Sequence, residues 1–229
     1  MVLGPPARYV GRGGAKLEAA LEQFGLDVAG RRCLDAGAST GGFTDCLLQH
    51  GAAEVWAVDV GHGQLHPRIR HDERVVVREH CNVRDLGPDD CGGAFDVVVA
   101  DLSFISLTTV AAALVRCTRE RGELVVLVKP QFEAGRREVS AGRGVITDPA
   151  SWRGALERVA SSLASHGTAV RGVVRSPLTG GDGNVEFLLH AGRGGPGLST
   201  AQLDAVLDDV TGVADPSTEP GAPGPHGGC

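Results

Sequence analysis

The sequence lacks the features that place a protein in a membrane or export it. Its 229 residues contain no apolar run that approaches the length of a transmembrane helix. The first residues, MVLGPPARYVGRGG, have no apolar core of the kind that a secretion signal carries. These absences argue against an integral membrane protein and a secreted one, and we expect a cytoplasmic protein.

Cysteine pairs and an excess of positive charge are also missing. None of the six cysteines belongs to a CxxC pair, so no zinc knuckle or thiol redox motif is indicated, and we expect buried free thiols. The formal net charge is −6, whereas a stand-alone nucleic-acid binder usually carries a basic surface. Composition alone therefore gives no support to a nucleic-acid partner.

The sequence does contain an alternation of short apolar strands with helices. Strands are predicted at 32–36, 54–59, 75–78, 95–101, 123–129, 169–175 and 184–190. Helices are predicted at 15–24, 42–50, 107–117, 148–166 and 198–211. Runs such as FDVVVAD and ELVVLVK are typical of strands covered on both faces. The alternation predicts an α/β fold, a doubly wound, Rossmann-like sheet of seven mostly parallel strands with helices on both faces and an antiparallel last strand.

The predicted elements divide the chain into three parts. We expect an N-terminal arm at 1–12, one α/β domain at 13–211 and a tail at 212–229. The tail is rich in proline and glycine and poor in apolar residues, which predicts disorder. A long polar loop, 131–147, interrupts the domain.

A glycine-rich turn, DAGASTGGFT, follows the first predicted strand. The strand ends at Asp35 and runs into Gly37, Gly41 and Gly42 before a helix, so the backbone can approach a ligand there. Its spacing departs from the GxGxxG of dinucleotide sites, which weighs against an NAD-dependent oxidoreductase.

Polar residues follow the next three strands. Asp59 can accept hydrogen bonds from the ribose hydroxyls of an adenosine, Asn82 can bond an adenine edge, and Asp101 would lie near a sulfonium. Taken singly, Asp59 could instead cap a turn and Asn82 could form an Asx turn. Their placement at successive strand ends favours S-adenosylmethionine as the cofactor.

Six stretches together resemble the TlyA family of ribosomal RNA 2′-O-methyltransferases, which share the FtsJ-type methyltransferase domain. They are YVGRGGAKL, DAGASTGGFT, VDVGHGQL, VVADLSFIS, VKPQFE and GNVEFLL. The resemblance implies a class I methyltransferase fold and a catalytic Lys-Asp-Lys-Glu tetrad at Lys16, Asp101, Lys129 and Glu186. The cofactor-binding residues expected from the turn, the strand ends and the resemblance are Asp35, Gly37, Ser39, Thr40, Gly41, Gly42, Phe43, Asp59, Asn82 and Asp101.

The chemistry of ribose methylation explains these residue types. A ribose hydroxyl must lose its proton as it attacks the methyl group, and Lys129 is the candidate base. A lysine can act so once burial or a second cation favours its neutral form, and Lys16 is the candidate cation. Asp101 and Glu186 would orient the lysines and the hydroxyl, and no metal is expected. Lys16 could instead be solvated, and Glu186 could be an outward-facing strand residue.

The chain also departs from the family pattern. TlyA-type proteins begin with a small S4-type RNA-binding domain, and this sequence starts at the linker that follows it. VGHGQLHPRIRH carries His62, His66 and His71, for which we favour a solvated loop or a substrate-contacting wall over a metal site. These departures leave the acceptor open between RNA, on the ribosomal subunit, and a small molecule of secondary metabolism.

Local basic clusters could meet a phosphate backbone despite the negative total. They are Arg8, Arg12 and Lys16; Arg68, Arg70, Arg74 and Arg78; and Arg136, Arg137 and Arg143. Scattered solvated arginines are an equal alternative. A membrane-lytic function is disfavoured, because no cationic amphipathic helix is evident.

Overall fold

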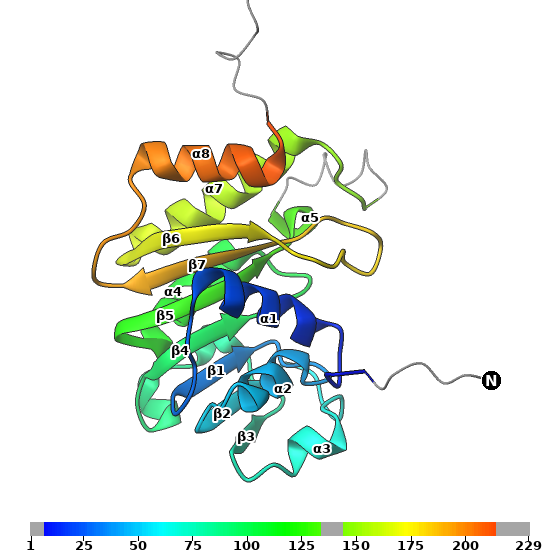
Figure 1. Cartoon of the computed structure of the whole chain (residues 1–229). Helices are drawn as coiled ribbons and strands as arrows, with labels where there is room; N and C mark the ends of the chain where they lie inside the picture. The colour runs from blue at the N-terminus through cyan, green and yellow to red at the C-terminus, as the bar shows by residue number, and fades with distance from the viewer. Residues whose placement is uncertain (1–6, 134–143, 214–229) are drawn as a thin grey trace, which may run out of the picture.

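Seven strands form one sheet in the order β3-β2-β1-β4-β5-β7-β6 in the computed structural model, which describes residues 7–133 and 144–213 (Figure 1). The strands are β1 (Arg32–Ala36), β2 (Glu54–Val58), β3 (Val75–Arg78), β4 (Phe95–Ala100), β5 (Thr118–Val128), β6 (Thr168–Arg175) and β7 (Phe187–Arg193). The first five pair in parallel, and β7 runs antiparallel to both β5 and β6. The predicted doubly wound, mostly parallel α/β fold with an antiparallel last strand is confirmed.

Helices cover both faces of this sheet. They are α1 (Gly13–Phe24), α2 (Gly42–Gln49), α3 (Pro67–Arg70), α4 (Leu107–Cys117), α5 (Pro130–Glu133), α7 (Pro149–Ser165) and α8 (Thr200–Thr211). Two 3₁₀ helices, η1 (Val83–Asp85) and η2 (Pro88–Cys91), precede β4. Figure 1 shows α1 and α2 in front of the sheet and α4 behind it. The result is a three-layer arrangement with a core on each side of the sheet.

The strand sequence explains the two cores. Along β4, Val97 and Val99 pack into the core beneath α1 and α2, whereas Val98 and Ala100 pack into the core beneath α4 and α7. All four side chains are fully buried. Side chains alternate between the faces of a strand, so a strand covered on both faces needs apolar residues at every position. The prediction from the run FDVVVAD, a strand covered on both faces, is therefore confirmed.

The strands β5 and β7 depart most from the predicted boundaries. β5 begins at Thr118 rather than Glu123. Thr118 pairs with Phe95 of β4, and residues 119–121, at the register shift that follows, are exposed polar residues that carry no apolar signal. β7 begins at Phe187, so Glu186 immediately precedes the strand. The predicted tail (apart from residues 212 and 213) and Arg136, Arg137 and Arg143 lie outside the described residues.

Candidate active site

One edge of the sheet gathers the polar residues that follow its strands. Asp59 comes directly after β2, Asp101 after β4 and Lys129 after β5. Glu186 reaches the same edge from the opposite chain direction, because it precedes the antiparallel strand β7. Parallel strands bring their carboxyl ends together, so residues far apart in the sequence become neighbours at this edge.

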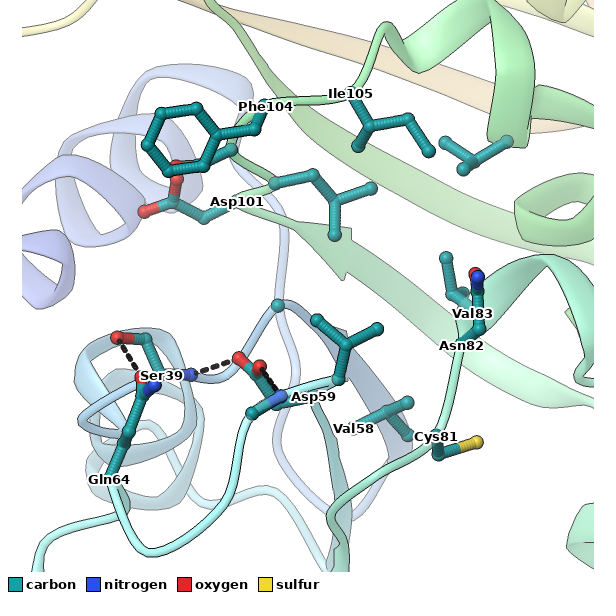
Figure 2. Close-up of a pocket in the computed structure, with 16 residues that line it drawn as sticks. Ser39, Val58, Asp59, Gln64, Cys81, Asn82, Val83, Asp101, Phe104 and Ile105 are labelled. Carbon is teal, nitrogen blue, oxygen red and sulfur yellow. Dashed lines mark hydrogen bonds between the residues drawn. The ribbon is translucent and has the colours of Figure 1, made fainter.

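A cavity of about 430 Å³ opens at this edge (Figure 2), and it is called the larger cavity because a smaller one adjoins it. Five of the predicted cofactor-binding residues line it, namely Gly37, Ser39, Asp59, Asn82 and Asp101. In Figure 2, Ser39 and Asp59 lie on one side of the cavity, and Asp101, Phe104 and Ile105 on the other. The larger cavity thus combines polar and apolar side chains in its lining, as ligand sites commonly do.

The carboxylate of Asp59 organises the floor of the larger cavity. Its Oδ2 accepts a hydrogen bond from the backbone N–H of Ser39 at 2.8 Å, and its Oδ1 accepts one from Gly61 at 2.7 Å. A carboxylate accepts about four hydrogen bonds, so each oxygen retains capacity for a ligand hydroxyl. Asp59 therefore both shapes the turn, as the turn-capping alternative required, and faces the cavity.

Asn82 combines a structural and a site position in the same way. Its Oδ1 accepts a hydrogen bond from the backbone N–H of Arg84 at 3.1 Å and caps η1. The Asx-type alternative is thus realised, and the residue also lines the larger cavity. Its side-chain amide has donors that this cap does not use.

Gly37 is required for the shape of the cavity wall. Its φ is +88°, and a β-carbon at this position would lie 2.5 Å from the backbone carbonyl oxygen of Asp101. Gly41, with φ +95°, plays another part, since its β-carbon would meet Leu65 at 2.9 Å. Gly37 therefore lets two strand ends approach each other, and Gly41 lets α2 begin against the segment before α3.

A smaller cavity of about 170 Å³ adjoins the larger one. Its lining includes the predicted residues Thr40, Gly42, Phe43 and Lys129, together with Gly13 at the start of α1. Four residues line both cavities, namely Gly37, Ser39, Asp101 and Ser103. A ligand in one cavity would therefore face a ligand in the other across Asp101 and Ser103.

Lys129 meets two oxygen atoms at this shared wall. Its Nζ lies 2.6 Å from Asp101 Oδ1 and donates to Ser103 Oγ at 3.0 Å. The Lys129 side chain is only 10% exposed. The solvated position that a lysine usually prefers is thus excluded, and the side chain is held at the cavity.

Lys16 and Glu186 form a second lysine–carboxylate pair, between α1 and the start of β7. Their side chains are 8% and 3% exposed, so neither is the solvated or outward-facing residue that the alternatives supposed. Val128 pairs with Phe187 in the sheet, which places Lys129 and Glu186 at the next position of the same register. The four tetrad positions thus form two ion pairs at one edge of the sheet.

Asp35 lies inside the protein rather than at a cavity wall. It is completely buried, and its Oδ2 accepts a hydrogen bond from Thr44 Oγ1 at 2.6 Å. Burial raises the pKa of Asp35 to about 7. Asp35 and Gly41 line neither cavity. Both residues instead contribute to the packing of the glycine-rich turn.

The histidines lie in loops around α3. The ring of His62 stacks on His80 at 4.8 Å, and His66 caps α3. Within residues 7–133 and 144–213 no group of three metal-ligating side chains comes together.

Several of the arginines in the predicted basic clusters are already neutralised. Arg70 pairs with Glu79, and Arg74 pairs with Asp72. Arg78 lies over the ring of Trp56. The stretch after β2 therefore offers less positive surface than its sequence suggested.

Ser103 and Phe104 are among the cavity-lining residues that the sequence did not single out. Ser103 and Phe104 follow Asp101, and Phe104 is 91% exposed with a φ of +64°. The signal was present, since LSFIS belongs to one of the family-like stretches, but only its preceding aspartate was singled out.

Comparisons with known proteins identify the family of this chain. A model of the FtsJ-like methyltransferase family matches residues 9–193. The chain is 54% identical over 181 residues to the 16S/23S rRNA (cytidine-2′-O)-methyltransferase TlyA of Mycobacterium tuberculosis, covering 79% of this chain and 67% of the relative. It is 46% identical over 203 residues to YqxC of Bacillus subtilis, covering 88% and 72%. A crystal structure from Lactococcus lactis, described as a "putative hemolysin", superposes with a TM-score of 0.82 at 45% identity, covering 88% and 98%.

The fold and the site define an S-adenosylmethionine-dependent methyltransferase. Solved structures of such enzymes share the fold even at 16% and 17% identity. The chain belongs to the FtsJ-like methyltransferase family, and its cofactor is S-adenosyl-L-methionine. None of the helices in the described part of the chain is long and apolar enough to cross a bilayer.

Proposed function

We propose that this methyltransferase acts on a ribose 2′-hydroxyl of ribosomal RNA. The observation that carries the proposal is the pairing of Lys129 with Asp101 and Ser103 at the wall that both cavities share. The 54% identical relative, named as an rRNA (cytidine-2′-O)-methyltransferase, supports the same acceptor. We expect the enzyme to work in the cytoplasm, where ribosomal RNA is found.

The larger cavity fits the adenosyl part of the cofactor. Asp59 would accept hydrogen bonds from the ribose hydroxyls with its remaining capacity, and the Asn82 amide would bond the adenine edge. Gly37 leaves open the space that a β-carbon would fill. When bound, S-adenosylmethionine supplies a methyl group activated by its sulfonium.

Lys129 is proposed as the group that receives the proton of the hydroxyl. A neutral amine has two N–H bonds and one lone pair. With the two N–H bonds directed to Asp101 and Ser103, the lone pair stays free for the substrate proton. After the transfer, the ammonium donates to the same two oxygens and retains the third N–H bond. Asp101 and Ser103 would thus orient the lone pair.

Lys16 and Glu186 are proposed to complete the site by fixing its charge. Lys16 and Glu186 line neither cavity, but the buried Lys16 ammonium would add a positive charge from the α1 side of the site, with Glu186 holding that ammonium in place. Gly13, one helical turn before Lys16, lines the smaller cavity, so this face of α1 is turned toward the site.

An RNA chain would approach past the start of α1. Arg12 is exposed and directly precedes Gly13. Arg8 and Arg68 are exposed nearby in the fold, although they pair with Glu18 and Asp45. A basic patch of this kind would contact phosphates, so its contribution should weaken with salt.

The test uses S-adenosylmethionine labelled in its methyl group. Ribosomal subunits that lack the modification are incubated with the full chain, and the RNA is digested to nucleosides. We expect RNase-sensitive label that co-elutes with a 2′-O-methylated nucleoside, and none with Lys129→Ala. Label that appears only in a small-molecule extract would contradict the RNA proposal and support a small-molecule acceptor.

A further inference from the structure

Glu133, the last residue of α5, is bonded to the start of α4. Its Oε1 accepts a hydrogen bond from the backbone N–H of Leu107 at 2.7 Å, and its Oε2 accepts one from Ser106 Oγ at 2.5 Å. Glu133 belongs to the segment after β5, whereas Ser106 and Leu107 belong to the segment after β4. One carboxylate therefore ties together the segments that follow two neighbouring strands.

The same two segments carry the reactive end of the site. The 101–107 segment supplies Asp101 and Ser103, and the 129–133 segment supplies Lys129, which contacts both. Further along, the rings of Phe104 and Phe132 lie 5.3 Å apart. The bonds of Glu133 come last in this row of contacts, so they close the two segments at the end away from Lys129.

Capping α4 alone does not explain this carboxylate. Ser106 already caps the helix, since its Oγ accepts a hydrogen bond from the backbone N–H of Thr108 at 3.1 Å. Burying a carboxylate costs free energy, and burial raises the pKa of Glu133 above its usual range. Glu133 accepts from a different N–H of the same helix start, that of Leu107, and it does so from another segment of the chain. Its distinct contribution is therefore the link between the two segments.

We propose that Glu133 is a positioning residue for methyl transfer, which holds the 101–107 segment against Lys129 so that Asp101 and Ser103 keep their distances to Nζ. The catalytic part of this inference rests on the proposed function of Lys129. Leu102, Ser103, Phe104 and Ile105 also line the larger cavity, so the same link shapes the wall of the cofactor site.

The experiment compares three variants of the full chain. Glu133→Ala removes both acceptors. Glu133→Gln keeps an acceptor for the Leu107 N–H and can donate to Ser106 Oγ. Ser199→Ala is the matched control, because Ser199 caps α8 by accepting from the N–H of Gln202, and α8 contributes no residue to either cavity. Each variant is measured for melting temperature, affinity for S-adenosylhomocysteine by calorimetry, and kcat and KM for unmodified ribosomal RNA.

We expect Glu133→Ala to lower kcat by about tenfold to a hundredfold, since misplacement by about 1 Å can cost this much, with a much smaller change in KM. Its affinity for S-adenosylhomocysteine should fall severalfold, and Glu133→Gln should restore most of both losses. Ser199→Ala should lower the melting temperature and leave affinity and kcat unchanged.

Glu133→Ala with a lowered melting temperature but wild-type affinity and kcat would overturn the inference and reduce Glu133 to a helix cap. If the wild-type protein methylated no ribosomal RNA, that result would contradict the proposed function without deciding the role of Glu133. The calorimetric comparison of Glu133→Ala with Ser199→Ala would still decide whether Glu133 positions the 101–107 segment.

Discussion

The side-chain nitrogen of Lys129 lies 2.6 Å from Asp101 Oδ1, although the two residues follow different strands of the sheet. The pairing exists because β4 and β5 are neighbouring parallel strands, so their carboxyl ends emerge side by side. Ser103 adds the second oxygen. In the neutral amine, this arrangement leaves the lone pair of the nitrogen for a substrate proton.

Lys129→Ala should abolish most methyl transfer and leave cofactor binding nearly intact. General base catalysis contributes about 10²–10⁴-fold, so kcat should fall by at least about a hundredfold. Lys129 does not line the larger cavity, so the affinity for S-adenosylhomocysteine should stay within about threefold of wild type. Radiolabel transfer and calorimetry measure the two quantities. Residual transfer near the wild-type rate would show that another group takes the proton.

Replacing either member of the buried pair Lys16–Glu186 should destabilise the fold. Lys16→Met leaves the Glu186 carboxylate, 3% exposed, without a counter-charge, and Glu186→Gln does the same to the Lys16 ammonium, 8% exposed. Each variant should lower the free energy of unfolding by about 3–5 kcal/mol. The double variant should lose less stability than the two single variants lose together, because it leaves no uncompensated charge. Urea unfolding measures all three. Additive losses would mean that the two side chains do not stabilise each other.

Asp35 should make stability depend on pH between about 4 and 7. Its pKa in the fold is about 7, whereas an unfolded aspartate titrates near 3.9. The folded state therefore binds this proton more tightly, and the free energy of unfolding falls as the pH rises through this window and levels off above it.

Asp35→Asn is the test of that dependence. The amide stays neutral, and its oxygen can still accept from Thr44 Oγ1. The difference in unfolding free energy between pH 5 and pH 8 should therefore shrink, by on the order of 2 kcal/mol. An unchanged difference would assign the pH dependence to other groups.

Gly37→Ala should impair cofactor binding beyond its backbone strain. Gly37 and Gly167 have nearly the same φ, +88° and +89°, but only at Gly37 would a β-carbon collide, 2.5 Å from the Asp101 carbonyl oxygen. Gly167→Ala should cost about 1–2 kcal/mol of stability through the strained φ alone, with unchanged affinity for S-adenosylhomocysteine. Gly37→Ala should cost more and weaken binding at least about tenfold. Equal behaviour of the two variants in unfolding and calorimetry would contradict the collision.

The strands and the site edge were predictable because their signals are local. Within FDVVVAD, residues 97–100 are all apolar, which identifies a central strand, and the next residue, Asp101, is the polar one that identifies its end. Asp59 and Asp101 were found in this way, whereas Lys129, at the end of the run ELVVLVK, received its role from the family resemblance. Glu186 was located by family resemblance alone, since its strand begins one residue later and its neighbours carry no pattern that marks it.

Other features needed contacts between distant segments. Asp35 and Asp59 both follow apolar runs, yet the first is enclosed against Thr44 and the second faces the larger cavity. The link from Glu133 to Leu107 joins residues on different strand–helix connections. Neither outcome is encoded in a local pattern, because both depend on which segments the sheet order brings together.

The sequence by itself thus determined the α/β fold, the edge where the site lies and the residue types available there, because hydrophobic periodicity and strand ends are properties of consecutive residues. Only the tertiary structure decided which lysine pairs with which carboxylate, which aspartate is buried and which arginines are neutralised. These outcomes depend on through-space distances of a few ångströms and on exclusion of water, and both are set by the packing of segments that the chain separates.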